Sequence, residues 1–138
     1  MFAVATSETM RSPEDLKILL AEDNVVNQRL MKLILSQLKV TVDVASDGKE
    51  AFEMYQQKAY DLIFMDVKMP VMDGMESTKL IREFEQTSGS SHQSLIVALT
   101  GSEIDEHKDE CFEIGMDGFI EKPIRIEMLQ KYISRLTE

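Results

Sequence analysis

The short apolar run Leu62–Met65, which ends abruptly at the carboxylate of Asp66, constrains the fold more than any other feature of the sequence. An uninterrupted apolar run of this length is typical of a strand buried on both faces, as in a parallel sheet. Pro70, Asp73 and Gly74 follow, and residues of these types form turns. The pattern therefore predicts a buried strand whose last residue, Asp66, lies at the edge of a sheet and at the mouth of a site.

The same pattern recurs along the chain, with helical segments between the strands. Further strands are predicted at 17–21, 40–45, 95–99 and 118–121. Apolar residues at helical spacing, such as Val26, Leu30 and Leu33, predict a helix after each strand. Parallel neighbours need crossover connections, and these place helices over both faces of the sheet. The chain is therefore predicted to be an α/β protein of alternating strands and helices.

Composition bounds the number of domains and the classes of partner. A chain of 138 residues with 43% hydrophobic residues is the size of one globular domain. We expect residues 1–15 to be a disordered tail or linker and residues 16–138 to be the domain. The net charge of −10 disfavours nucleic acid and anionic membranes as partners. The single cysteine, Cys111, fits a reducing cytoplasm, and no apolar run approaches the roughly 20 residues of a membrane span.

Polar residues at the strand ends predict a binding site. In an open α/β sheet, ligands bind beyond the carboxyl ends of the strands. Here those ends carry Glu22, Asp23, Asp66, Thr100 and Lys122, which are therefore expected to meet. Two like charges about 4 Å apart repel by roughly 4 kcal/mol at an effective dielectric of 20, so three carboxylates need a cation. Oxygen ligands without a nearby histidine or cysteine favour Mg²⁺, which also binds phosphate oxygens.

This residue set is suited to phosphoryl transfer, which needs little beyond positioning and charge neutralisation. Asp66 would be the nucleophile, because a carboxylate can accept a phosphoryl group as an acyl phosphate. Thr100 would supply a hydroxyl and Lys122 a mobile positive charge. Each residue alone is more often a helix cap, a turn residue or a solvated charge. Their joint placement at the ends of four strands favours the functional interpretation.

Four segments of the chain carry a family resemblance. They are Glu22-Asp23-Asn24, Met65–Gly74, Leu99-Thr100-Gly101 and Phe119–Pro123. Together they resemble the receiver domain of two-component response regulators, over essentially all of residues 16–138. The resemblance implies a doubly wound five-stranded parallel sheet, (βα)5, with flavodoxin-like strand order 2-1-3-4-5. It implies a phospho-accepting role in a His-Asp phosphorelay, without enzymatic activity beyond self-catalysed phosphorylation and dephosphorylation of the aspartate.

The resemblance also implies a role for each acidic residue. Asp66 matches the phosphoacceptor. Asp23, Asp66 and the Lys68 backbone carbonyl match the direct ligands of Mg²⁺, for which Mn²⁺ is expected to substitute, and Glu22 matches a residue that acts through water. Lys68 and Ser102 occupy positions that in this family influence the lifetime of the phosphoryl group.

Other matched residues concern the state after transfer. Lys122 matches the lysine that contacts the phosphoryl group, and its bond to Pro123 is expected to be cis. Thr100 and Phe119 match the switch pair: Thr100 would move toward the phosphoryl group and Phe119 would turn inward. This movement would change the face formed by the predicted fourth helix, fifth strand and fifth helix. The chain is expected to be a monomer or a weak dimer through that face.

Partners follow from the same resemblance. The segment Ala21–Gln28 is most similar to receivers attached to hybrid sensor histidine kinases. The implied partner is a histidine kinase or a histidine phosphotransfer protein, with neither nucleic acid nor direct membrane contact. The implied location is cytoplasmic, either in a free-standing regulator or tethered to a membrane sensor kinase.

Three rival functions fit parts of the pattern. A phosphatase of the haloacid dehalogenase type also uses a strand-end aspartate with Mg²⁺, but it needs an acidic residue where this chain has Lys68. A flavodoxin-like cofactor binder is suggested only by the segment Thr100–Ser102. A receiver fold that serves only for docking is disfavoured, because all the chemical residues are present.

Overall fold

The structure is a computed structural model, and it describes residues 11–89, 91–101 and 104–137. Its centre is a parallel sheet of five strands in the order β2-β1-β3-β4-β5. The strands are β1 (Ile18–Ala21), β2 (Val42–Ala45), β3 (Leu62–Asp66), β4 (Leu95–Thr100) and β5 (Gly118–Glu121). The predicted α/β class and the predicted strand order are confirmed.

Five helices and one short turn of 3-10 helix complete the fold. They are η1 (Pro13–Asp15), α2 (Val25–Gln37), α3 (Gly48–Gln57), α4 (Gly74–Thr87), α5 (Ile104–Glu113) and α6 (Ile126–Thr137). The side chains of Asn24, Asp47 and Asp73 cap α2, α3 and α4 by accepting a backbone N–H three residues further on. These side chains therefore start the three helices. Within the described ranges, no helix is both long and apolar enough to cross a membrane.

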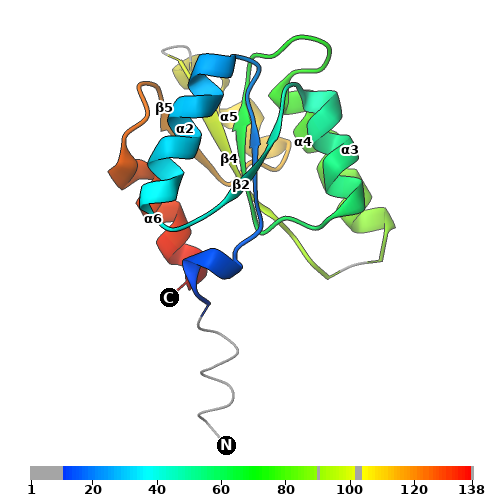
Figure 1. Cartoon of the computed structure of the whole chain (residues 1–138). Coiled ribbons are helices and arrows are strands. Elements are labelled where there is room, and N and C mark those ends of the chain that lie inside the picture. The colour runs from blue at the N-terminus through cyan, green and yellow to red at the C-terminus, as the bar shows by residue number, and fades with distance from the viewer. Residues whose placement is uncertain (1–10, 90, 102–103, 138) are drawn as a thin grey trace, which may run out of the picture.

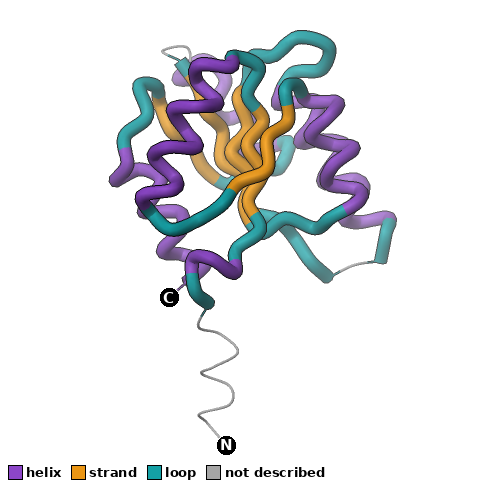
Figure 2. The backbone as a smooth tube through the Cα atoms, in the orientation of Figure 1, coloured by secondary structure: helices purple, strands orange, loops and turns teal. Residues whose placement is uncertain are grey.

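The sheet forms a central layer between two groups of helices (Figure 2). Successive strand residues point to opposite faces, so Leu20 and Phe64 belong to one buried cluster and Leu19 and Ile63 to another. The first cluster packs against α2 and α6, and the second against α3, α4 and α5. Figure 1 shows α2 and α6 on one side and α3 and α4 on the other. Both faces of the sheet are thus buried, which explains why β1, β3 and β4 are apolar up to their carboxyl ends, whereas the edge strand β2 is half-buried and contains Asp43.

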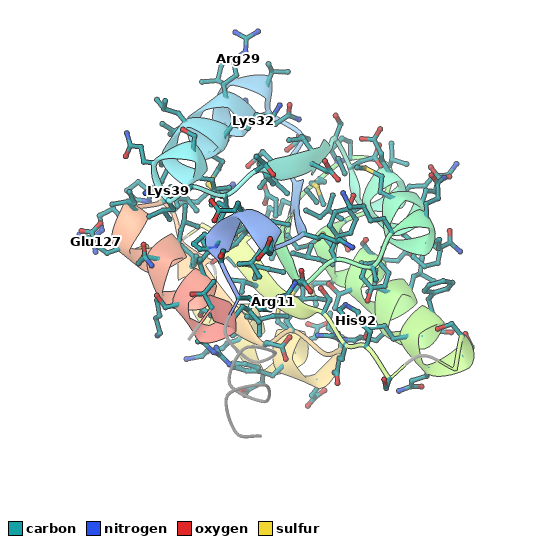
Figure 3. The ribbon with its side chains drawn as sticks, turned by 60° about the horizontal axis from the view of Figure 1, so that its bottom comes forward. Arg11, Arg29, Lys32, Lys39, His92 and Glu127 are labelled. Carbon is teal, nitrogen blue, oxygen red and sulfur yellow. The ribbon has the colours of Figure 1, made fainter. Side chains whose placement is uncertain are left out.

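Residues 11–15, which the sequence assigns to a tail or linker, have defined structure and contact the domain. The Arg11 guanidinium donates to both carboxylate oxygens of Asp61, at 3.1 and 2.9 Å. The Lys17 backbone N–H donates to the same carboxylate at 2.8 Å. Figure 3 shows Arg11 at the end of the molecule where η1 lies. A pair 50 positions apart leaves no local signal in the sequence. The assignment of residues 1–15 to a disordered tail or linker, with the domain beginning at residue 16, stays a prediction.

The outer side of α2 is unusually apolar. Val26, Leu30 and Leu33 are 70%, 51% and 60% exposed, whereas Met31 and Leu35 are the residues that α2 buries. Helical spacing of the three exposed residues correctly predicts the helix. They nevertheless face away from the sheet, because α2 carries apolar side chains on more than one side and periodicity alone does not say which side packs.

Candidate functional site

The carboxyl ends of the strands lie together at the top of the molecule in Figure 1. Asp66 is the last residue of β3, and Glu22 directly follows β1, its neighbour in the sheet. Glu22 is 2% exposed and Asp66 5% exposed, whereas Asp23 is open to solvent. One carboxylate oxygen from each of the three residues lies within 4.8 Å of the others. The three carboxylates that the sequence predicts to meet therefore do so.

A lysine directly after β5 completes the charged cluster. Lys122 follows β5, and its backbone N–H donates to the Thr100 carbonyl at 2.7 Å. Its ammonium donates to Asp66 Oδ2 at 3.0 Å and lies 3.7 Å from Glu22 Oε1. The Lys122-Pro123 peptide bond is cis, as expected. Lys122 thus spans the gap between two buried carboxylates.

The second oxygen of Asp66 is held by the loop that follows it. The Lys68 backbone N–H donates to Asp66 Oδ1 at 3.2 Å, so the loop is in contact with the carboxylate. Gln28 and Asn24 support Glu22 in a similar way: the Gln28 amide donates to the Glu22 carbonyl at 2.6 Å, and the Asn24 N–H donates to Glu22 Oε2 at 3.0 Å. Backbone and amide donors therefore fix the two buried acidic residues in place.

The predicted switch residues lie beside this cluster. Thr100 is 3% exposed, and its hydroxyl donates to the Gly101 carbonyl at 3.1 Å. Phe119 is half-buried, and its ring packs edge-on against Phe112, with ring centroids 4.7 Å apart. Thr100 lines the cleft and Phe119 packs against the buried cluster under α3, α4 and α5. Ser102 lies outside the described residues.

The charges of the cluster do not balance. Three carboxylates gather around the ammonium group of Lys122, which pairs with Glu22 and Asp66, so negative charge is in excess among these four described residues. Burial raises the pKa of Glu22, the Asn24 N–H lowers it, and the charge of Asp66 raises it again, so that it is raised overall. Burial lowers the pKa of Lys122, but its hydrogen bond to Asp66 and the nearby carboxylates raise it overall. A divalent cation would neutralise the excess negative charge of the carboxylates, and the hard oxygen donors suit Mg²⁺.

The cluster opens into a cleft of about 330 Å³. The residues that line it are Glu22, Asp23, Asn24, Asn27, Asp66, Val67, Lys68, Leu99, Thr100, Gly101 and Lys122. Sequence reasoning assigned no role to Asn27 or Gln28, although both lie in the first turn of α2, directly after the acidic pair. The available signal for Asn27 is its place in the first turn of the helix that follows the strand end with Glu22 and Asp23, because ligands bind at this edge of such a sheet.

Comparison with known families identifies the chain. A family model described as the response regulator receiver domain matches residues 18–134. The chain belongs to this family. The prediction that it is a receiver domain of His-Asp phosphorelay signalling is thereby confirmed, and the haloacid dehalogenase alternative gains no support.

Relatives of this receiver domain include histidine kinases that are much longer. Hybrid signal transduction histidine kinase K of Dictyostelium discoideum is 39% identical over 130 residues, which are 91% of this chain and 11% of that protein. The chain likewise spans 11% of the length of hybrid signal transduction histidine kinase F of the same organism.

Two solved structures are similar over most of the receiver domain. The receiver domain of sensor histidine kinase PA1611 from Pseudomonas aeruginosa has a TM-score of 0.77 and 33% identity, and the match covers 88% of this chain and 97% of that one. It holds a magnesium ion in its active-site cleft. The receiver domain of Ssk1 from Saccharomyces cerevisiae, in complex with the histidine phosphotransfer protein Ypd1, has a TM-score of 0.83 and 32% identity, with 92% and 91% coverage.

Proposed function

We propose that Asp66 accepts a phosphoryl group from a phosphohistidine in a reaction that requires Mg²⁺. The observation that carries the proposal is the meeting of Glu22, Asp23 and Asp66 within 4.8 Å, with the ammonium of Lys122 3.0 Å from Asp66. In the transfer, the phosphorus–nitrogen bond of the donor breaks as a bond forms between phosphorus and a carboxylate oxygen of Asp66. The imidazole leaves with the bonding electrons and takes up a proton.

Each charged residue has a part in this scheme. Asp23, Asp66 and the Lys68 carbonyl would hold Mg²⁺ directly and Glu22 through water, and the ion would neutralise the carboxylates and the phosphoryl oxygens. Lys122, already 3.0 Å from Asp66, would contact the phosphoryl group after transfer. The PA1611 receiver with its bound magnesium supports this arrangement. Mn²⁺ is proposed as a substitute on the same ligands.

The proposed switch uses Thr100 and Phe119. The Thr100 hydroxyl would exchange its bond to the Gly101 carbonyl for one to the phosphoryl group. Phe119 would then turn into the space that Thr100 leaves, and its contact with Phe112 would change. Because Phe112 is 45% exposed, this movement would alter the surface formed by α5, β5 and α6, which a partner or a second copy could bind.

The donor is proposed to dock on the outer side of α2. The exposed Val26, Leu30 and Leu33 lie beside a cavity of about 160 Å³, and its lining includes Leu30 together with Glu22 and Lys122 of the charged cluster. An apolar surface therefore leads directly to the site.

The charge of α2 points to an acidic donor surface. α2 contains Arg29 and Lys32 but no acidic residue, although the chain as a whole carries a net charge of −10. Lys39 lies two residues after the helix; all three basic residues are exposed, and Figure 3 labels them along α2. A donor with an apolar centre and acidic rim would be complementary. A histidine kinase or histidine phosphotransfer protein is the proposed donor, which the similarity to the Ssk1 receiver in its Ypd1 complex supports.

Exposure to a small phosphoryl donor tests the chemistry. Acetyl phosphate or phosphoramidate with Mg²⁺ should add the mass of one phosphoryl group to the native chain and none to Asp66→Asn. Removal of Mg²⁺ with a chelator should prevent the addition. Equal labelling of the two chains would contradict the assignment of Asp66. Sustained hydrolysis of a generic phosphomonoester would instead favour a phosphatase over a domain that only phosphorylates and dephosphorylates itself.

A protein donor tests the docking surface separately. Leu33→Asp should slow transfer from a phosphorylated histidine phosphotransfer protein by about tenfold or more, because a charge would enter an apolar contact. Its labelling by acetyl phosphate should not change. Gln56→Asp is the matched control, since it also places a negative charge at an exposed helix position, but on α3, on the other side of the sheet from α2. Equal slowing by both variants would contradict docking on α2.

A further inference from the structure

The loop between β3 and α4 holds one residue in a strained conformation. Val71 has a φ of +69°, in the left-handed region that β-branched residues rarely adopt. The Met72 N–H donates to the Pro70 carbonyl at 2.7 Å, which closes a tight γ-turn around Val71. Val71 is 78% exposed, so its own packing does not hold it in this conformation. The surrounding structure must therefore stabilise the loop.

The first residue of α3 provides the contact at the tip of the loop. The Gly48 N–H donates to the Met72 carbonyl at 2.9 Å. A Cβ atom at position 48 would overlap the Met72 carbonyl oxygen and lie 2.8 Å from the Asp73 oxygen. Both are backbone atoms, so the loop itself would have to move. Only glycine allows α3 to approach the loop this closely.

Gly48 is in turn fixed by the helix that follows the loop. The Ser77 hydroxyl, which is completely buried in α4, donates to the Gly48 carbonyl at 2.8 Å. At the base of the loop, the Gly74 N–H donates to the Val67 carbonyl at 2.9 Å. The loop is thus held at its tip by α3 and at its base by the first residue of α4.

This loop also contacts the charged site. The Lys68 N–H, near the start of the loop, donates to Asp66 Oδ1 at 3.2 Å. A shift at the tip would therefore be transmitted through a short, strained segment to the Asp66 carboxylate. We infer that Gly48 is a positioning residue for the phosphoacceptor site: its contact with Met72 holds the Lys68 backbone where it orients Asp66 and offers a carbonyl to Mg²⁺. The inference rests on the proposed function and adds a residue that lies outside the cleft.

Measurement of Mg²⁺ affinity by calorimetry, with no phosphoryl donor present, tests the inference. Gly48→Ala should weaken Mg²⁺ binding by about 10- to 100-fold, as changes in residues that orient metal ligands commonly do. Gly89→Ala is the matched control. It also adds a methyl group at a glycine, with a φ of +76° and open space around it, but far from the loop in sequence and at the other end of α4. Its Mg²⁺ affinity should change by less than about twofold.

A second pair of variants separates positioning from loss of folding. Val71→Gly removes the strain, so Gly48→Ala combined with Val71→Gly should recover part of the lost Mg²⁺ affinity. If Gly48→Ala does not fold, Ser77→Ala should still weaken Mg²⁺ binding by about fivefold, because it removes one hydrogen bond from Gly48.

The outcomes distinguish this inference from the proposed function. Unchanged Mg²⁺ affinity in folded Gly48→Ala, or in Ser77→Ala if the former does not fold, would overturn the inference and leave the function of Asp66 intact. An equal loss of Mg²⁺ affinity in Gly48→Ala and Gly89→Ala would also overturn the inference, because the effect would then reflect general destabilisation of the fold. Failure of the native chain to bind Mg²⁺ would overturn the proposed function together with the inference.

Discussion

Two charged clusters of the molecule differ in how completely their charges are paired. The phosphoacceptor site places Glu22, Asp23 and Asp66 against one lysine and leaves an excess of negative charge. The other cluster lies between α3, α4 and the turn before β5 and centres on Arg82 and Glu85; we call it the Arg82–Glu85 network. Both contain buried carboxylates, but Arg82 forms an ion pair with each carboxylate of its network, Glu85 and Asp117, whereas Lys122 pairs with Glu22 and Asp66 of the three carboxylates at the other site.

Hydrogen bonds engage both carboxylate oxygens of Glu85 in this network. Glu85 Oε1 accepts from Arg82 at 2.8 Å, and Oε2 accepts from the Tyr55 hydroxyl and the Ser94 N–H. Arg82 also donates to Asp117 and to the Gly115 carbonyl, each at 2.8 Å. Burial and the hydrogen bond to Glu85 raise the pKa of Tyr55, so its hydroxyl remains a donor. The network ties α3, α4, β4 and the turn before β5 together without an added ion.

The comparison shows that burial of charge serves two purposes in one small domain. In the Arg82–Glu85 network, partners are built into the fold, so the charges hold elements together. At the proposed phosphoacceptor site, Mg²⁺ would supply part of the neutralisation and a phosphoryl group would add negative charge, so occupancy would be coupled to conformation. The following predictions test this difference, from the largest expected effect to the smallest.

Arg82→Met should be the most destabilising change. It leaves Glu85 and Asp117 without their cation, and breaking a buried ion pair costs about 3–5 kcal/mol of the free energy of unfolding. Urea unfolding measures the loss. Lys79→Met, at an exposed position on the same helix, should change stability by less than about 0.5 kcal/mol. Similar losses in the two variants would show that the network is not a structural centre.

The same substitution should have opposite effects in the two clusters. Without Mg²⁺, Glu85→Gln should lower the free energy of unfolding by about 1–3 kcal/mol, because an amide N–H₂ would face the donors that Glu85 now accepts from. Glu22→Gln should raise it by about 1 kcal/mol, because burial and the charge of Asp66 raise the pKa of Glu22 and so disfavour its charged form.

Saturating Mg²⁺ provides the control for this pair. The gain from Glu22→Gln should disappear when Mg²⁺ is bound, whereas the loss from Glu85→Gln should not change. Unfolding curves of the three proteins with and without Mg²⁺ give both differences. If Glu22→Gln and Glu85→Gln changed the free energy of unfolding in the same direction without Mg²⁺, the contrast between the clusters would be refuted.

Lys68→Ala should lengthen the lifetime of the phosphoryl group by about two- to fivefold, the effect of the roughly 0.5–1 kcal/mol that an exposed charge contributes. Lys68 is exposed beside the cleft, where its charge would stabilise the carboxylate that leaves during hydrolysis. The decay of phosphorylated protein, followed by intact mass, measures the lifetime. Lys79→Ala should leave the decay unchanged, and an unaltered rate in Lys68→Ala would remove this role.

The smallest effect is expected at the pair of Arg11 and Asp61, which is paired but partly exposed. Burial raises the pKa of Asp61, but Arg11 and the Lys17 N–H lower it overall. A lowered pKa stabilises the fold above the unfolded value of about 3.9, and this contribution is lost as the pH falls through the lower folded value. Asp61→Asn should therefore cost about 0.5–1 kcal/mol at pH 7, with solvent screening limiting the loss.

The difference between Asp61→Asn and the native chain should shrink as the pH falls below about 4. Chemical unfolding at several pH values checks this dependence. A difference that is constant from pH 7 down to acid pH would mean that the stabilisation does not come from the charge of Asp61.

The membership of the phosphoacceptor site could be predicted almost completely from the sequence. Glu22, Asp23, Asp66, Thr100 and Lys122 all stand at the ends of apolar runs, and parallel strands bring their carboxyl ends to one edge. The position of a strand follows from local sequence, and the alignment of the carboxyl ends follows from the general rules of parallel sheets. Neither prediction requires knowledge of how side chains pack. The roles of these residues follow from the family resemblance, and their chemistry still awaits experiment.

Other features depended on contacts between residues far apart in the chain. Three contacts join separate elements, and no periodicity or motif in the sequence predicts them. They are the Gly48–Met72 contact, the Arg82–Asp117 pair and the Arg11–Asp61 pair. Glu85, on the inner side of α4, is indistinguishable in sequence from a solvated helix residue. The exposure of Leu30 and Leu33 was likewise decided by how α2 rotates onto the sheet.

The sequence by itself thus determined the fold, the edge at which the site lies and the residues that meet there. The reason is that local runs of apolar residues, each ending in a polar residue, predict the buried strands and their ends. Tertiary structure alone decided which face of α2 is free, which carboxylates have built-in partners and how the loop after Asp66 is held. Those features depend on packing distances and side-chain directions between distant segments, which no local pattern encodes.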